Sequence, residues 1–322
     1  MKRQEIIGKK IIKVMDSTVN FTVLVVLLLL LVIGVYAMWD SKQIYEAASS
    51  QVYEMYKPTK EESLSFEELK KFNSDVIAWL EVYGTTIDYP VLQAEDNNKY
   101  LNKDVMGKYS LSGSLFLDYQ NAPDFSDFNS IIFGHHMDKA VMFGGIDRFT
   151  DKDYFEKHRY GNLFFEGKNH GVEFFAFLEV DAYDYTIYRV AVPDNAREEY
   201  LENLLEKATY TRNTGAIIEE NIVLLSTCTS ESTNGRHILV GRITDEVYQN
   251  EFIEEQEVNK GVGADQRIGL FERIPIIVWV IFVIVLFIFL LSLYSERKRK
   301  VRKRNRSERG MEYEKKSKDK MH

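Results

Sequence analysis

Two long apolar stretches stand out in an otherwise mixed pattern of polar and apolar residues. They cover residues 21–39 and 274–294, and neither contains a charged side chain. Each is close to the ~20 residues that a helix needs to cross hydrocarbon, and both carry aromatic residues near an end, as membrane interfaces favour. The pattern predicts two transmembrane helices. The first is expected to be an uncleaved anchor, because Val35-Tyr36-Ala37 is a poor signal-peptidase site.

The flanks of these stretches are basic. Residues 1–20 hold five Lys/Arg against two Asp/Glu, and residues 295–322 hold thirteen against five. Because the whole chain carries −8, the segment 21–294 carries −19. The positive-inside rule therefore predicts a two-pass protein of the cell membrane with both basic tails, 1–20 and 295–322, in the cytoplasm and the acidic middle outside the cell.

Between the spans, composition divides the chain into three parts. Residues 40–62 are polar and predict a helical or flexible stalk, residues 63–244 predict one folded extracellular domain, and residues 245–273 predict an acidic linker. A domain of this size can bury a core without disulfides.

Local patterns predict few helices in the folded domain. Ser65 and Glu68 form a capping box that predicts a helix through Phe72. Residues 73–75 predict the start of another helix, through Leu80. A third is expected from Asp194-Asn195 to about Lys207, because its apolar positions have the helical period.

Short apolar runs bounded by turn residues predict strands elsewhere. They cover residues 86–92, with Pro90 indicating an edge strand, and residues 113–117, 130–133, 162–167, 172–177, 185–192, 222–226 and 238–243. Residues 167–171 read as the turn of a hairpin. This series predicts a mainly β fold, a closed barrel of about eight strands with N-terminal helices and a helix before the strand that ends at Cys228.

Cys228 is the one cysteine of the chain, so it forms no internal disulfide. It is either a small buried hydrophobe or a nucleophile presented at a strand end. His135 follows another buried run and Gly134, and Arg236 precedes a third run. A thiol, an imidazole and a fixed cation at one rim of a barrel could attack a carbonyl, exchange protons and stabilise an oxyanion. The remaining histidines fit less well: His170 and His158 are expected at the surface, and His237 alternates with Arg236 across a strand.

Other interpretations of these patterns compete. Adjacent His135 and His136 point opposite ways on a strand, and no ligand stands at metal spacing beside them, so no metal site is expected. The basic tail resembles a nucleic-acid patch, but next to a span it favours contact with membrane lipid. A non-enzymatic extracellular binding domain with a buried Cys228 stays open as an alternative function.

Three separated motifs resemble the sortase family. Leu224-Leu225-Ser226-Thr227-Cys228 with Arg236 is similar to the T-L-x-T-C strand and Arg of sortases, and residues 132–137 with 142–144 look like the class B histidine segment. Residues 75–80, 86–93 and 113–118 also resemble class B, so the resemblance covers about residues 64–244. Leu224 replaces the first Thr, and the second span is more typical of class C, although no Asp-Pro-aromatic lid is present.

The resemblance implies a sortase-type barrel and a cysteine transpeptidase without a cofactor. Cys228 would attack the Thr carbonyl of an L-P-x-T-G or N-P-x-T-N type sorting signal, His135 would protonate the leaving amine, and Arg236 would stabilise the oxyanion. Thr227 would contact substrate, and His136 would be structural. The implied partners are a surface protein or pilin and an amine acceptor, either a pilin lysine or a peptidoglycan precursor. The two-span topology slightly favours pilus assembly over wall anchoring, and a cysteine hydrolase would differ only in using water as the acceptor.

Overall fold

The computed structural model describes residues 2–58, 64–215, 218–228 and 234–252, together with Phe287, Tyr294 and Lys298. The chain divides into two compact units, Met1–Trp39 with Ala264–His322, and Asp40–Gly263. The helix α1 (Lys2–Ala48) begins in the first unit and ends in the second, and it carries an unburied segment long and apolar enough to cross a membrane. The second predicted span lies outside the described residues except for Phe287 and Tyr294. The ring of Phe287 lies 6.3 Å from the ring of Phe21.

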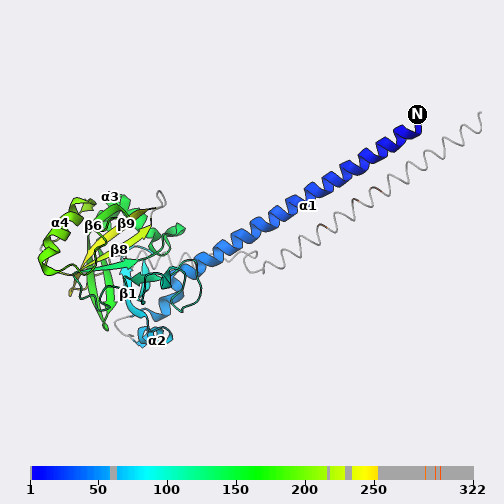
Figure 1. The fold of residues 1–322 in the computed structure, drawn as a ribbon. Coiled ribbons are helices and arrows are strands. Elements are labelled where there is room, and N and C mark those ends of the chain that lie inside the picture. The colour runs from blue at the N-terminus through cyan, green and yellow to red at the C-terminus, as the bar shows by residue number, and fades with distance from the viewer. Residues whose placement is uncertain are drawn as a thin grey trace, which may run out of the picture. The chain divides into compact units, whose positions relative to one another are not determined.

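The second unit contains a β-barrel (Figure 1). Its sheet has the strand order β5-β1-β2-β3-β4-β8-β9-β6-β7, and an additional pairing of β5 with β6 closes eight of the strands into a ring. The ninth, β7, pairs with β6 outside that ring. The strands are β1 (Val76–Val82), β2 (Asp88–Leu92), β3 (Leu115–Leu117), β4 (Asn129–Phe133), β5 (Tyr160–Phe165), β6 (Lys168–Asp181), β7 (Ala208–Thr211), β8 (Ile222–Cys228) and β9 (Gly235–Thr244). The predicted closed barrel is therefore confirmed.

The helical segments after α1 are short, and they precede β1 or connect strands. They are η1 (Ser50–Tyr56), α2 (Leu64–Phe72), η2 (Lys99–Leu101), η3 (Asp138–Ala140), η4 (Phe143–Thr150), α3 (Lys152–Lys157), η5 (Asp194–Ala196) and α4 (Arg197–Glu206). The helix before β8 is confirmed as α4. The helix predicted from Ser65 is confirmed as α2, which begins one residue earlier, so Ser65 lies within the helix and its hydroxyl donates to the carbonyl of Lys57.

The two faces of β8 pack into different cores because side chains alternate along a strand. Val223 and Leu225 belong to the larger cluster, which includes Phe177 and Leu239. Ile222 and Leu224 belong to a second cluster that α4 and the segment after β6 cover. The strand β8 is thus packed on both faces.

The helix predicted for residues 73–80 is wrong. The side chain of Asn73 accepts a hydrogen bond from the backbone of Asp75, which forms an Asx turn instead of a helix cap. The chain then enters β1, where Val76, Ala78 and Leu80 are buried. The same residues fit both a helical and a strand pattern over this short length, and pairing with β2 and β5 decides the outcome.

Two other strand predictions need correction. Pro90 does not mark an edge strand, because β2 lies between β1 and β3. The pairing of β2 with β3 begins only at Val91, so no ladder hydrogen bond is lost at the proline. Residues 185–192 form no strand. They form an irregular segment in which Ile187 and Val192 are buried in the second core cluster.

The surface positions predicted for two histidines are also wrong. The hairpin turns at Glu166 and Gly167, both with positive φ, so His170 lies within β6 and stacks on Phe165. His158 is 4% exposed and stacks on Tyr154, with ring centroids 3.7 Å apart. Both rings therefore belong to the core and not to the solvated face.

Candidate active site

The parallel pairing of β4 with β8 brings the predicted histidine and cysteine to one edge of the sheet. Phe133 is the register partner of Ser226, and the amide of Gly134 donates to the carbonyl of Ser226 at 3.2 Å. His135 and Cys228 each follow two residues after this paired position. Because parallel strands end at the same edge and lie about 4.8 Å apart, the two backbones leave the sheet side by side.

A tight hairpin follows β4 and carries His135. The backbone amide of Phe143 donates to the carbonyl of His135 at 3.1 Å, and His136 pairs with Met142. Gly134 is required at its start because a Cβ there would overlap the side chains of Leu115 and Phe143. The packing of the hairpin against β3 therefore fixes where the His135 backbone lies.

The imidazole of His135 is also oriented. Its Nε2 lies 2.6 Å from the carbonyl oxygen of Leu101, at the end of η2. A carbonyl oxygen only accepts, so Nε2 carries the hydrogen and Nδ1 is the nitrogen left for proton exchange. The ring is half-buried, which leaves it accessible from solvent.

Arg236 stands directly across the ladder from Cys228. The two residues are register partners in the antiparallel pair of β8 with β9, and this pairing places their Cα atoms within about 5.5 Å. The guanidinium donates from one Nη to the carbonyl of Gly235 at 2.8 Å and is partly exposed. A permanent cation therefore lies beside the cysteine position, and among the described residues the hydrogen bond to Gly235 uses only one of the N–H donors of its fork.

A groove of about 400 Å³ joins these residues. His135, Thr227 and Arg236 all line it, beside Ser226 at the end of β8. Its walls combine amide side chains with apolar ones, contributed by Asn97, Asn98, Leu101, Phe116, Phe133, Ala182 and Tyr188. The structure thus brings together the predicted residues His135, Thr227 and Arg236 in one concave site at the end of the catalytic strand.

Thr227 differs from the other groove residues in its burial. Thr227 is 2% exposed, and its hydroxyl has no hydrogen-bond partner among the described residues. On the ladder it pairs with His237, one position away from the Cys228–Arg236 pair. Its contact with substrate stays a prediction.

Several groups that support the groove are not apparent from sequence motifs. The hydroxyl groups of Tyr188 and Ser226 lie 2.8 Å apart, which attaches the irregular segment after β6 to the catalytic strand. Asn97 donates to the carboxylate of Asp118 at 2.8 Å, which orients its amide. Asp147 accepts from both His136 and His237. Each connects residues distant in sequence, so no local signal indicates it.

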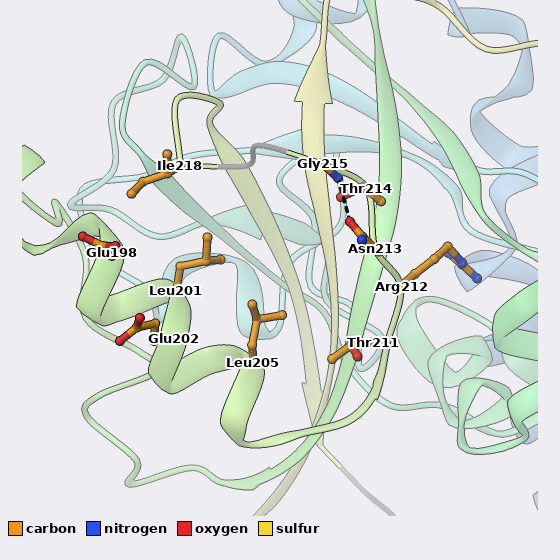
Figure 2. Close-up of a pocket in the computed structure, with 10 residues that line it drawn as sticks. All are labelled: Glu198, Leu201, Glu202, Leu205, Thr211, Arg212, Asn213, Thr214, Gly215 and Ile218. Carbon is orange, nitrogen blue, oxygen red and sulfur yellow. Dashed lines mark hydrogen bonds between the residues drawn. The ribbon is translucent and has the colours of Figure 1, made fainter.

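A second cavity, of about 450 Å³, lies between α4 and the segment that follows β7 (Figure 2). Leu201 and Leu205 project toward it from α4. Arg212 donates its hydrogen bonds to the carbonyl oxygens of Phe155 and Phe174. This cavity shares no described lining residue with the groove and contains none of the predicted catalytic residues, so we place the active site in the groove.

A closed barrel with a cysteine at the end of one strand, a histidine on its parallel neighbour and an arginine on its antiparallel neighbour defines a cysteine transpeptidase of the sortase type. The model of the sortase domain matches residues 80–244, and the chain belongs to the sortase family.

Its relatives are class B enzymes. The chain is 32% identical over 209 residues to sortase B of Listeria monocytogenes. The aligned region covers 63% of this chain and 82% of the relative. Among solved structures, sortase B from the type II pilus of Streptococcus pneumoniae is 43% identical, with a TM-score of 0.50 over 56% of this chain and 99% of the other. A Streptococcus pyogenes class B sortase involved in pilus biogenesis is 40% identical, with a TM-score of 0.52 over 55% and 97%.

Proposed function

We propose that this sortase joins pilin subunits by cleaving a sorting signal after Thr and transferring the acyl group to a lysine amine. The observation that carries the proposal is the convergence of His135, Arg236 and the backbone of Cys228 at one end of the groove. Two relatives of 40% identity or more are described as pilus sortases, which favours polymerisation over wall anchoring.

The first chemical step is attack of the Cys228 thiolate on the Thr carbonyl carbon. The carbonyl becomes a tetrahedral oxyanion, and the guanidinium of Arg236 stabilises the charge as it develops. His135 then donates a proton to the leaving amine, and the C–N bond breaks to leave a thioacyl enzyme.

The second step reverses these roles. An incoming amine attacks the thioester carbon, His135 accepts the amine proton, and the Cys228 sulfur leaves as a thiolate. The acceptor is a pilin lysine in the leading proposal and a peptidoglycan precursor in the alternative. The hydrogen bond from His135 Nε2 to the carbonyl of Leu101 leaves Nδ1 as the nitrogen that exchanges the proton in both steps.

The apolar segment of α1 supports a membrane-bound form of the enzyme. In this arrangement the barrel lies outside the cell with both basic tails inside, and the second span at 274–294 returns the chain to the cytoplasm. Cysteine labelling of introduced sites at both tails, with a membrane-impermeant reagent on intact cells, tests this topology. Reaction of either tail in intact cells would contradict it.

A peptide panel tests the transfer reaction. Peptides with L-P-x-T-G and N-P-x-T-N signals are incubated with the full chain and either a pilin-derived lysine peptide or a peptidoglycan stem peptide, and products are scored by mass spectrometry. Cys228→Ala is expected to abolish cleavage while the barrel stays folded by circular dichroism. Unchanged product from Cys228→Ala would end the proposal. Product formed with water at the same rate in the presence of either amine would favour a hydrolase.

A further inference from the structure

A carboxylate behind the active site binds two histidines at once. Asp147 Oδ2 lies 2.5 Å from Nε2 of His136, and Asp147 Oδ1 lies 2.7 Å from Nδ1 of His237. The side chains of His136, Asp147 and His237 are 17%, 29% and 9% exposed, so the bridge is largely shielded from water. An ionised carboxylate only accepts, so each imidazole donates to it.

The bridge joins the two elements that carry the catalytic histidine and arginine. His136 follows His135 in the hairpin after β4, and His237 follows Arg236 in β9. Asp147 lies in η4, which packs against both β8 and β9. Neighbouring residues on a strand point to opposite faces, so the bridge lies on the side of the sheet away from Arg236.

The histidine hairpin needs such a support because its backbone is strained. Lys139, Ala140 and Met142 have φ values of 61°, 57° and 52°, a region that residues with side chains rarely adopt. Strained backbone persists where surrounding contacts determine it. Backbone pairing of His136 with Met142 holds the first residues of the hairpin. The hydrogen bond from the His136 imidazole to Asp147 holds the same residue, next to His135, through its side chain.

A metal ion is not the better interpretation of this cluster. Both oxygens of Asp147 already accept charge-assisted hydrogen bonds, and the Nε2 atom of His237 lies 4.0 Å from a carboxylate oxygen of Glu179. In the part of the chain that the structure describes, no group of three or more His, Cys, Asp and Glu side chains has the geometry to hold a metal.

We infer that Asp147 is a positioning residue that sets the separation of His135 from Cys228 and Arg236 by tying the side chain of His136, and with it the hairpin, to His237 in β9. The inference rests on the proposed roles of those three residues. It assigns no contact between Asp147 and substrate. None of His136, Asp147 and His237 lines the groove, so loss of the bridge lowers the rate of acyl transfer more than it weakens peptide binding.

The test compares three variants of the full chain. Asp147→Ala removes the bridge, Asp147→Asn keeps an amide oxygen that accepts from one imidazole, and Asp153→Asn changes an exposed carboxylate on α3 as the matched control. We expect Asp147→Ala to lower kcat at least tenfold with KM within twofold, Asp147→Asn to recover part of that loss, and the control to match the wild type. The pH profile of Cys228 alkylation by iodoacetamide should shift in Asp147→Ala, because the imidazole beside the thiol has moved.

Two results overturn the inference. One is a folded Asp147→Ala enzyme with wild-type kcat; the other is a loss confined to KM with an unchanged alkylation profile. If Asp147→Ala fails to fold, His237→Phe and His136→Phe each remove one donor to Asp147 while keeping a ring, and wild-type kcat in both would overturn it equally. Failure of the proposed function is separate, because it would show as activity retained in Cys228→Ala.

Discussion

Cys228 and Arg236 are direct cross-strand partners at the end of the β8–β9 ladder. They are eight positions apart in sequence, yet the ladder fixes their backbones as opposite neighbours. The guanidinium is therefore held by the sheet itself and not by a flexible loop. This pairing gives the arginine its proposed role as the stabiliser of the oxyanion that forms on the cysteine-bound carbonyl.

Replacement of Arg236 should act mainly on the chemical step. We expect Arg236→Ala to lower kcat about 10²–10³-fold, the loss typical for removal of one oxyanion donor. Arg236→Lys should recover only part, because an ammonium lacks the planar fork. Steady-state transpeptidation measures both, with the exposed Lys152→Ala as control. An Arg236→Ala enzyme with wild-type kcat and a raised KM would assign the residue to binding alone.

Tyr89 connects the end of α1 to the histidine hairpin. Its hydroxyl donates to the carbonyl of Ala48 and accepts from the amide of Met142, both at 3.1 Å, and burial raises its pKa to about 12. Tyr89→Phe leaves both partners buried and unsatisfied, so the free energy of unfolding should fall by about 1–3 kcal/mol.

Chemical denaturation with urea measures this loss, and Tyr109→Phe, at a site that is 74% exposed, is the control. Equal stability of the two variants would show that the contact with Ala48 adds nothing. A fall in kcat of Tyr89→Phe would in addition connect the α1 end to the position of His135.

Buried histidines predict a loss of stability in acid. Burial lowers the pKa of His158 and of His170 below the ordinary value of 6.5. Both are neutral in the folded barrel and gain a proton on unfolding, so the unfolded state binds more protons as pH falls through 6.5. Their contribution is complete above that pH and declines below it toward the lowered folded pKa.

Urea unfolding between pH 5 and pH 8 measures this slope. His158→Phe keeps an aromatic ring between Tyr154 and Phe252 and removes one titrating group, so its stability should depend less on pH. An identical slope in the variant and the wild type would assign the acid sensitivity to other groups.

Glu173 holds two arginines on the barrel wall. Its carboxylate is 3% exposed. It binds Arg159, which directly precedes β5, at 2.5 Å, and Arg242, which lies in β9, at 2.6 Å. Glu173→Gln leaves two guanidinium groups facing a neutral amide, and we expect a loss of about 3–5 kcal/mol in the free energy of unfolding. Glu166→Gln at the exposed hairpin turn is the control, and a loss below about 1 kcal/mol at Glu173 would contradict the expectation.

Local sequence patterns were sufficient for much of the fold and site. The runs ending at Phe133 and Cys228 and the run after Arg236 predicted three strands, and all three are confirmed. These strand predictions succeeded because each depends on a few consecutive residues whose burial is set by their own apolar character. The choice of His135 among the six histidines came from its place directly after Gly134 and from the family resemblance, and its catalytic role stays a prediction.

Long-range contacts decided the predictions that failed. Residues 73–80 fit two periodicities until β2 and β5 pair with them. His158 is buried because Tyr154 and Phe252 enclose it, and the second of these lies 94 positions away in sequence. Asp147 reaches His237 across 90 positions, so its role is visible only once the barrel has closed.

The closed ring of strands has a consequence for how the enzyme reads its substrate. β8 is hydrogen-bonded to β4 on one side and to β9 on the other, so a peptide cannot join the catalytic strand as an additional strand. We therefore expect discrimination between sorting signals to depend on side chains that line the groove outside the ladder, among them Asn97, Leu101 and Tyr188. On this view, a change in the signal that is read needs changes only in segments outside the closed ring of strands.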